Sequence, residues 1–216
     1  MTALNPQWPI PLLGPLFDGE CVRVGWPDAD EFDAITALRN RPDVRRQFLD
    51  PRPLDRQRNR EWLQHGMKRP EEAVLAIRMK ADGMFVGTIG WSHGDPQAGS
   101  IEIGRLMVDT RVLRAYRDVL PRDYAGVAVD ASVGLLDFVF TVLNVRLAYT
   151  VVMAGNALAL RTNREAGGRI VRTSIERRAD GSEVQLIHLE CDRDAWTRRR
   201  NPVDMASAAA ATAAPA

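Results

Sequence analysis

The most informative segment of this 216-residue chain is Tyr124-Ala-Gly-Val-Ala-Val-Asp-Ala-Ser-Val-Gly-Leu-Leu-Asp-Phe138. Small residues at its start predict a turn, and apolar residues then recur at helical spacing, which predicts an amphipathic helix from Val127 to Leu143. The first amide groups of a helix are unpaired, and Gly126 and Ala128 let a ligand approach the backbone closely. This turn is therefore a candidate site for a phosphate group.

The segments around this helix predict a sheet. Alternating apolar residues and turn signals indicate strands on both sides of it, and helical spacing indicates two further helices before it. The predicted strands are Glu20 to Trp26, Ala73 to Met79, Met84 to Trp91, Ser100 to Val108, Arg146 to Met153, Arg169 to Ile175 and Val184 to Cys191. Helices are predicted after Asp28 or Asp30, from Leu54 to His65, and between Asn156 and Gly167. The predicted fold class is α/β (α+β), with a mixed, mostly antiparallel sheet and helices on both faces.

Four short motifs in this order resemble the GCN5-related N-acetyltransferase (GNAT) superfamily, particularly the branch similar to ribosomal-protein N-terminal acetyltransferases. They are Phe-Val-Gly-Thr-Ile-Gly at 85–90, Ile-Glu-Ile-Gly at 101–104, Gly126-Val-Ala128, and Asn156 through Gly167-Gly168. The resemblance covers roughly Glu20 to Asp192. It implies that the fourth and fifth strands, Ser100 to Val108 and Arg146 to Met153, splay apart. Acetyl-CoA is then expected in the gap, with its pyrophosphate on the turn before Val127.

The resemblance also implies which residues hold the cofactor. Backbone groups of a splayed strand edge can hydrogen-bond an amide-bearing cofactor arm. The expected cofactor-binding residues are Leu106, Met107 and Val108 on that edge, Gly126, Val127, Ala128, Val129 and Ser132 at the phosphates, and Asn156 and Arg161 beyond the fifth strand. The alternatives are an ordinary interior strand, a simple helix start, a plain helix cap at Asn156 and a solvated helix residue at Arg161.

The sequence departs from the family pattern in three places. Asp123 and Tyr124 stand where the family has a basic or amide residue and a glycine, so the charge opposite a pyrophosphate is expected from Arg114, Arg117 and Arg122. The segment from Asp109 to Tyr124 is longer than the usual connection. Asn163 stands where many members place a tyrosine that protonates the thiolate, which leaves this proton to water, Tyr116 or Tyr124.

Glu102 is the predicted catalytic base. Strand alternation places its side chain opposite Ile101 and Ile103, on one face with Gly104 and Leu106. A surface or salt-bridging role is the alternative. His93 is a second candidate base, because imidazole titrates near neutral pH. Tyr124 is the third predicted catalytic residue, as a proton donor, and Asp109 at the end of the strand is placed to meet an incoming amine.

Composition narrows the functional classes. The chain is 45% hydrophobic and 26% charged with a net charge of +1, so no overall field recruits nucleic acid or a membrane. Cys21 and Cys191 lie far apart, and no Cys/His cluster has metal-ligand spacing, so no metal is expected. Eight arginines from Arg39 to Arg60 are interspersed with acidic residues, which favours a solvated helix face over an RNA-binding surface.

We therefore expect one acyl-CoA N-acyltransferase domain over residues 20–192, preceded by a Pro-rich arm at 1–19 and followed by a basic, then Ala-rich, disordered tail at 193–216. The expected function is acetyl-CoA-dependent N-acetyl transfer, directly onto a primary amine of a small molecule (an amino sugar or amino acid derivative) or a protein N-terminus. The alternative is a catalytically degenerate GNAT-fold binding or assembly module. A cytoplasmic monomer or homodimer without membrane contact is expected.

Overall fold

The computed structural model describes residues 15–66, 71–178 and 180–200. Eight strands form one sheet in the order β1-β2-β3-β4-β5-β6-β8-β7, and all neighbours are antiparallel except β5 and β6. The strands are β1 (Pro15–Asp18), β2 (Val22–Gly25), β3 (Ala73–Met79), β4 (Phe85–Asp95), β5 (Ser100–Val108), β6 (Leu147–Met153), β7 (Arg169–Arg177) and β8 (Glu183–Asp192). The helices are α1 (Glu31–Asn40), α2 (Pro42–Arg45), α3 (Arg56–Gly66), α4 (Thr110–Leu113), the 3-10 turn η1 (Arg114–Tyr116), α5 (Val127–Thr141), α6 (Ala157–Glu165) and α7 (Arg193–Arg200). The predicted fold class is confirmed.

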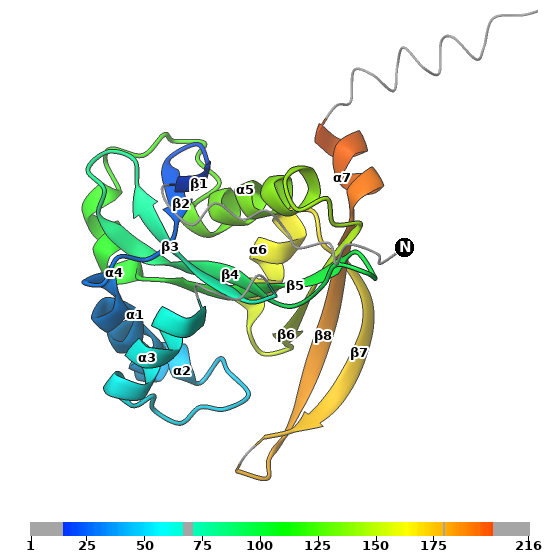
Figure 1. The fold of residues 1–216 in the computed structure, drawn as a ribbon, viewed down its shortest axis with the longest axis horizontal. Helices are drawn as coiled ribbons and strands as arrows, with labels where there is room; N and C mark the ends of the chain where they lie inside the picture. Colours follow the sequence, from blue (N-terminus) through cyan, green and yellow to red (C-terminus); the bar gives the residue numbers. More distant parts are fainter. Residues whose placement is uncertain (1–14, 67–70, 179, 201–216) are drawn as a thin grey trace, which may run out of the picture.

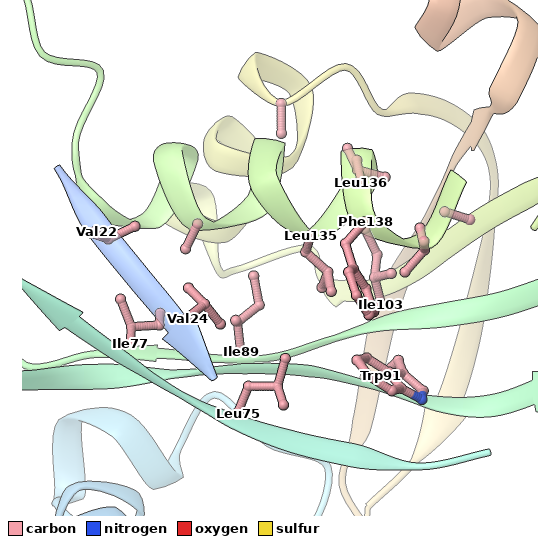
Figure 2. Close-up of a cluster of buried hydrophobic side chains, with 14 of the residues drawn as sticks. Val22, Val24, Leu75, Ile77, Ile89, Trp91, Ile103, Leu135, Leu136 and Phe138 are labelled. Carbon is pink, nitrogen blue, oxygen red and sulfur yellow. The ribbon is translucent and has the colours of Figure 1, made fainter. Parts of the chain in front are cut away.

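Helices cover both faces of the sheet. Figure 1 shows α1, α2 and α3 on one side and α5 on the other. The main core lies between α5 and the sheet, as Figure 2 shows. Trp91 is fully buried there, and its ring stacks on Phe138 with centroids 6.1 Å apart. A second apolar cluster, which includes Phe32, Leu63 and Met107, lies between α1, α3 and the opposite face.

Strand β5 contains a bulge that reverses its alternation. Thr88 is paired with Met107 and Gly90 with Gly104, so a single β4 residue spans two residues of β5, and Arg105 there has a φ of 52°. An extra residue in one strand turns the following side chains to the other face. Leu106 consequently packs against the α5 core together with Ile103. The prediction that Leu106 shares a face with Glu102 was therefore wrong.

The parallel pair β5 and β6 splays apart. Its register runs from Ser100 opposite Leu147 to Glu102 opposite Tyr149, and within the described residues the two strands pair no further. Beyond that point they diverge toward Val108 and Met153. This confirms the predicted splay, and it leaves the β5 edge at residues 106–108 without a strand neighbour on that side.

The last residues of the predicted N-terminal arm belong to the sheet. Residues 15–18 form β1, which pairs with β2. Phe17 anchors it, because its ring lies 5.8 Å from the ring of Phe138 and so close to Gly134 that a Cβ there would come within 2.6 Å of it. Residues 1–14 of the arm lie outside the described residues.

The predicted disordered tail begins with a helix. Residues 193–200 form α7, and Trp196 is buried, with its Nε1 donating to Asp137 Oδ1 at 2.7 Å. The expectation of disorder was wrong for these residues, because a single buried tryptophan anchors an otherwise strongly basic segment. Residues 201–216 lie outside the described residues.

Candidate functional site

Helix α5 begins in a conformation that keeps its first amides accessible. Its N-cap, Gly126, has φ 99° and ψ 152° and provides no side-chain cap. The first helical hydrogen bond runs from Asp130 N to Gly126 O at 3.0 Å, so the amides of Val127, Ala128 and Val129 precede it. A Cβ on Gly126 would meet nothing within 4 Å. Uncapped amides beside open space suit an anion.

Ser132 does not belong to this anion site. Its side chain is buried, and its Oγ donates to the carbonyl oxygen of Ala128 at 2.7 Å. The residue lies one turn into the helix on a buried face. This geometry does not favour the prediction that its hydroxyl serves a phosphate.

The long connection before α5 contributes positive charge. It forms α4 and η1 and then turns at Tyr124. Arg114, Arg117 and Arg122 are exposed, and within the described ranges none of them has an ion-pair partner within 4 Å. These side chains are free to approach a phosphate near Gly126, although Asp123 beside them is acidic.

Arg161 lies on the exposed surface of α6. Its side chain is 75% exposed and forms an i,i+4 ion pair of 2.7 Å with Glu165. Both line a surface hollow whose other residues come from the C-terminal end of α6, the start of β7, and α7. No residue of the first turn of α5 lines that hollow. Arg161 thus has a partner within its own helix, and its contact with the phosphates of CoA stays a prediction.

Asn156 caps the helix that follows the splayed strand. Its side chain accepts a hydrogen bond from Ala159 N at 3.1 Å, which confirms the predicted cap. Asn163, which replaces the family tyrosine, donates to the carbonyl oxygen of Ala159 at 2.8 Å.

The two candidate bases form one pair. His93 Nδ1 and Glu102 Oε2 are 2.7 Å apart, because Ser92 and Glu102 are cross-strand neighbours in β4 and β5. Glu102 is 26% exposed and His93 is 75% exposed. Glu102 occupies the last paired position before the splay opens, on the sheet face away from α5. A carboxylate there can accept a proton, and the imidazole can orient it.

Tyr124 has a different partner. Its hydroxyl donates to Asp130 Oδ2 at 2.8 Å, and the same carboxylate accepts hydrogen bonds from Glu20 N and Cys21 N. Burial, reinforced by Asp130, raises the pKa of Tyr124. The residue thus links α5 to the β1–β2 turn, and this geometry does not favour its predicted role as proton donor.

Tyr116, the other predicted proton donor, and Asp109, the predicted contact of the amine, also have partners within the protein. Tyr116 donates to Asp82 Oδ2 at 2.6 Å, and this hydrogen bond raises its pKa to about 12. Asp109 accepts from Arg41 Nη1 at 2.7 Å and caps α4 through Arg111 N. Neither side chain is free to meet a substrate.

Sequence reasoning missed Tyr149. It lies directly opposite Glu102 at the last β5–β6 pair, where the strands begin to diverge. Burial raises its pKa, and the nearby Glu102 and Asp95 raise it further. The signal in the sequence was its place in the fifth predicted strand, but the register that makes it a neighbour of Glu102 cannot be read from spacing.

A sheet that opens beside an uncapped helix N-terminus is the arrangement expected of an enzyme that holds a coenzyme A thioester. The model of the acetyltransferase (GNAT) domain family matches residues 24–169, more than half of the chain. The chain therefore belongs to the GNAT acetyltransferase family. Members of this family use acetyl-CoA in acyl transfer, and the open turn at Gly126 and the unpaired edge of β5 fit such a group.

Solved structures share the fold at low sequence identity. The spermidine N-acetyltransferase from Vibrio cholerae in complex with CoA and spermine is 14% identical, with a TM-score of 0.69, and the match covers 82% of this chain and 98% of that one. A GCN5-related N-acetyltransferase from Brucella melitensis is 21% identical, with a TM-score of 0.64 and coverage of 90% and 86%. A nucleotide-linked sugar GNAT is 15% identical, with a TM-score of 0.64 and coverage of 88% and 95%.

No curated protein matches the chain significantly. In the described part of the chain, no helix is both long enough and apolar enough to cross a membrane.

Proposed function

We propose that the chain is an acetyl-CoA-dependent N-acetyltransferase that transfers the acetyl group directly to a primary amine. The acceptor is a small molecule, such as an amino sugar or an amino acid derivative, or a protein N-terminus as in the ribosomal-protein branch. The observation that carries the proposal is the opening of β5 and β6 beyond Glu102 and Tyr149, on the sheet that α5 covers. A cofactor arm and a pyrophosphate can be held there by one continuous surface.

The backbone of this surface supplies most of the binding. Acetyl-CoA provides the acetyl group as a thioester. The free edge of β5 at Leu106, Met107 and Val108 hydrogen-bonds the amides of the pantetheine arm. The amides of residues 126–129 and the α5 dipole hold the pyrophosphate. Asn156 lies at the end of β6, where it caps α6 beside the same opening.

Glu102 and Tyr149, at the start of the splay, carry out the proton transfers. Glu102 accepts a proton from the incoming ammonium, and His93 orients the carboxylate. Tyr149, a phenol that is protonated at neutral pH, donates a proton to the departing thiolate and regains one from the attacking nitrogen as the amide forms. Direct transfer, without an acetylated cysteine, also agrees with the environment of Cys191. This residue is buried, and burial raises its pKa to about 11, so it is a poor nucleophile.

A thiol-release assay with acetyl-CoA and a broad panel of amines tests the proposal. We expect CoA release that depends on the amine, and a mass increase of one acetyl group on the acceptor. If acetyl-CoA binds but no amine is acetylated, the degenerate binding module becomes the better account. That alternative is favoured by one observation, the engagement of Asn163 in a helix hydrogen bond where the family has a proton donor.

A further inference from the structure

A second cavity, of about 90 Å³, is lined by residues of α1, α3, β3, β4 and β5. Figure 1 shows that α1 and α3 lie on the sheet face opposite α5. Met107 and Arg105 of β5 and Thr88 of β4 form its floor, so it adjoins the bulge and the splayed edge. Phe48 and Trp62 contribute apolar walls, and Arg39 enters from α1. The cavity therefore lies on the same sheet face as Glu102, within one strand of the opening.

Arg39 is a buried cation that forms no ion pair within 4 Å in the described part of the chain, although the charge of Asp50 acts on it at longer range. It is 8% exposed, its guanidinium lies 3.7 Å from the centroid of the Phe48 ring, and its Nη2 donates to the carbonyl oxygen of Asp50 at 2.7 Å. Its Nη1 is buried and, within the described residues, has no hydrogen-bond partner. Burying an unpaired charge and an unused donor costs free energy, so such groups are normally compensated.

Arg105 adds a second cation to the same cavity. It forms an ion pair with Glu72 and lies over the ring of Trp62, 5.0 Å from its centroid. Its Nε is also buried without a partner among the described residues. Burial lowers the pKa of both guanidinium groups, the direction expected for incompletely compensated cations. Glu72 is the one carboxylate that pairs directly with either guanidinium in the described ranges, whereas Asp50 and Glu102 act on them only at longer range.

We propose that this cavity binds a carboxylate of the acceptor, so that the acceptor is a small amine that also carries a carboxylate. The inference rests on the proposed function and specifies its substrate class. A planar carboxylate satisfies the free N–H groups of Arg39 and Arg105 and pairs with Arg39, which has no direct ion-pair partner among the described residues. The apolar walls take the carbon skeleton, and the amine lies toward Glu102. A polycation such as spermidine is repelled by the two guanidinium groups.

The first experiment measures binding and needs no turnover. N-acetylleucine and N-acetylphenylalanine, which resemble the product, are titrated calorimetrically into the full chain, each beside its neutral amide. We expect the acids to bind at least tenfold more tightly than the amides. In Arg39→Met this preference should be lost. Arg58→Gln is the matched control, because Arg58 is an exposed arginine of α3 that does not line the cavity. This variant should keep the preference for the acids.

A second variant and two further ligands keep the test decisive. If Arg39→Met does not unfold cooperatively, Arg39→Lys, which keeps the charge but loses the planar fork, should reduce the preference. Inorganic phosphate and spermidine are titrated in parallel. Equal binding of acids and amides, absence of binding by all acids, or preference for phosphate or spermidine overturns the inference.

The thiol-release assay separates this inference from the proposed function. Leucine and phenylalanine are compared with 3-methylbutylamine and 2-phenylethylamine, the matched amines without a carboxylate. Faster acetylation of the neutral amines overturns the carboxylate site and leaves the acetyltransferase proposal intact. Carboxylate-selective binding without acetylation of any amine contradicts the acetyltransferase proposal and leaves the carboxylate site intact.

Discussion

At the scale of single residues, the contact between Glu102 and His93 organises the proposed chemistry. Glu102→Gln keeps the size of the side chain but cannot accept a proton, so kcat should fall about a hundredfold or more while acetyl-CoA affinity changes little. The increase of kcat with pH that reflects loss of a proton from the base should also disappear. Steady-state kinetics across pH measures both effects. A near-normal kcat would assign the proton to His93 or to ordered water.

Tyr149 offers a second test of proton transfer. Tyr149→Phe removes only the hydroxyl, so kcat should fall by about a hundredfold, whereas the KM for acetyl-CoA should stay close to the wild-type value. Tyr116→Phe is a matched control, because its hydroxyl is bonded to Asp82. Equal kcat values for Tyr149→Phe and wild type would rule out this donor.

Tyr124 should matter for stability and not for chemistry. Tyr124→Phe leaves the buried Asp130 short of one donor, which should cost about 1–3 kcal/mol, with kcat unchanged. Because its pKa is raised in the folded state, the Tyr124 hydroxyl stays protonated there at pH values above roughly 10, the pKa of a tyrosine in the unfolded chain. The hydroxyl therefore contributes fully to the free energy of unfolding below pH of roughly 10 and loses this contribution as the pH rises further. The Tm difference between wild type and variant should then narrow. Thermal unfolding from pH 7 to about pH 11 measures this; a large loss of kcat in the variant would contradict it.

At the scale of elements, the sequence predicted what strong local patterns encode. The bounds of β3 and β5 and the first residue of α5 agree with the structure, because apolar alternation and a small-residue turn define them. The bulge in β5 could not be predicted, since Arg105 is not a residue type that favours a positive φ. The placement of Leu106 depends on that bulge. The pairing of Glu102 with His93 depends on the register of β4 and β5 and on the positive φ of His93, and the ion pair between Asp109 and Arg41 is a tertiary contact.

Helix α7 carries a prediction of its own. Trp196→Ala should lower the free energy of unfolding by about 3–5 kcal/mol, because a large buried ring is removed. Trp196→Phe, which keeps an aromatic ring and loses only the donor to Asp137, should cost less. Urea denaturation compares the two. Stability unchanged in Trp196→Ala would mean that the segment does not pack on the domain in solution.

At the scale of the whole molecule, the proposed site combines segments that lie far apart in the sequence. Arg39 in α1 and Arg105 in β5 line the cavity on one face of the sheet, and the turn at Gly126 precedes the helix that covers the other face. Local sequence patterns do not predict this arrangement. The segment from Arg39 to Arg60, with eight arginines, shows what a local pattern predicts and what it does not. Arg52 and Arg56 form exposed ion pairs, as a solvated face predicts. Arg41 is largely buried and pairs with Asp109, and Arg39 is buried in the cavity. Its burial follows from the packing of α1 and α3 on the sheet.

The central claim is that acetyl-CoA binds along the splayed edge with its pyrophosphate on the first turn of α5. Calorimetric titration of acetyl-CoA into wild type, Gly126→Ala and Gly126→Glu tests it most directly. Both variants share the backbone strain of a side chain at positive φ, but only glutamate adds bulk and negative charge to the open space. The account predicts one binding site in wild type, a modest loss of affinity in Gly126→Ala and a loss of about a hundredfold or more in Gly126→Glu, in line with a buried like-charge contact. No binding by the wild type, or the same affinity in Gly126→Glu as in Gly126→Ala, would contradict it.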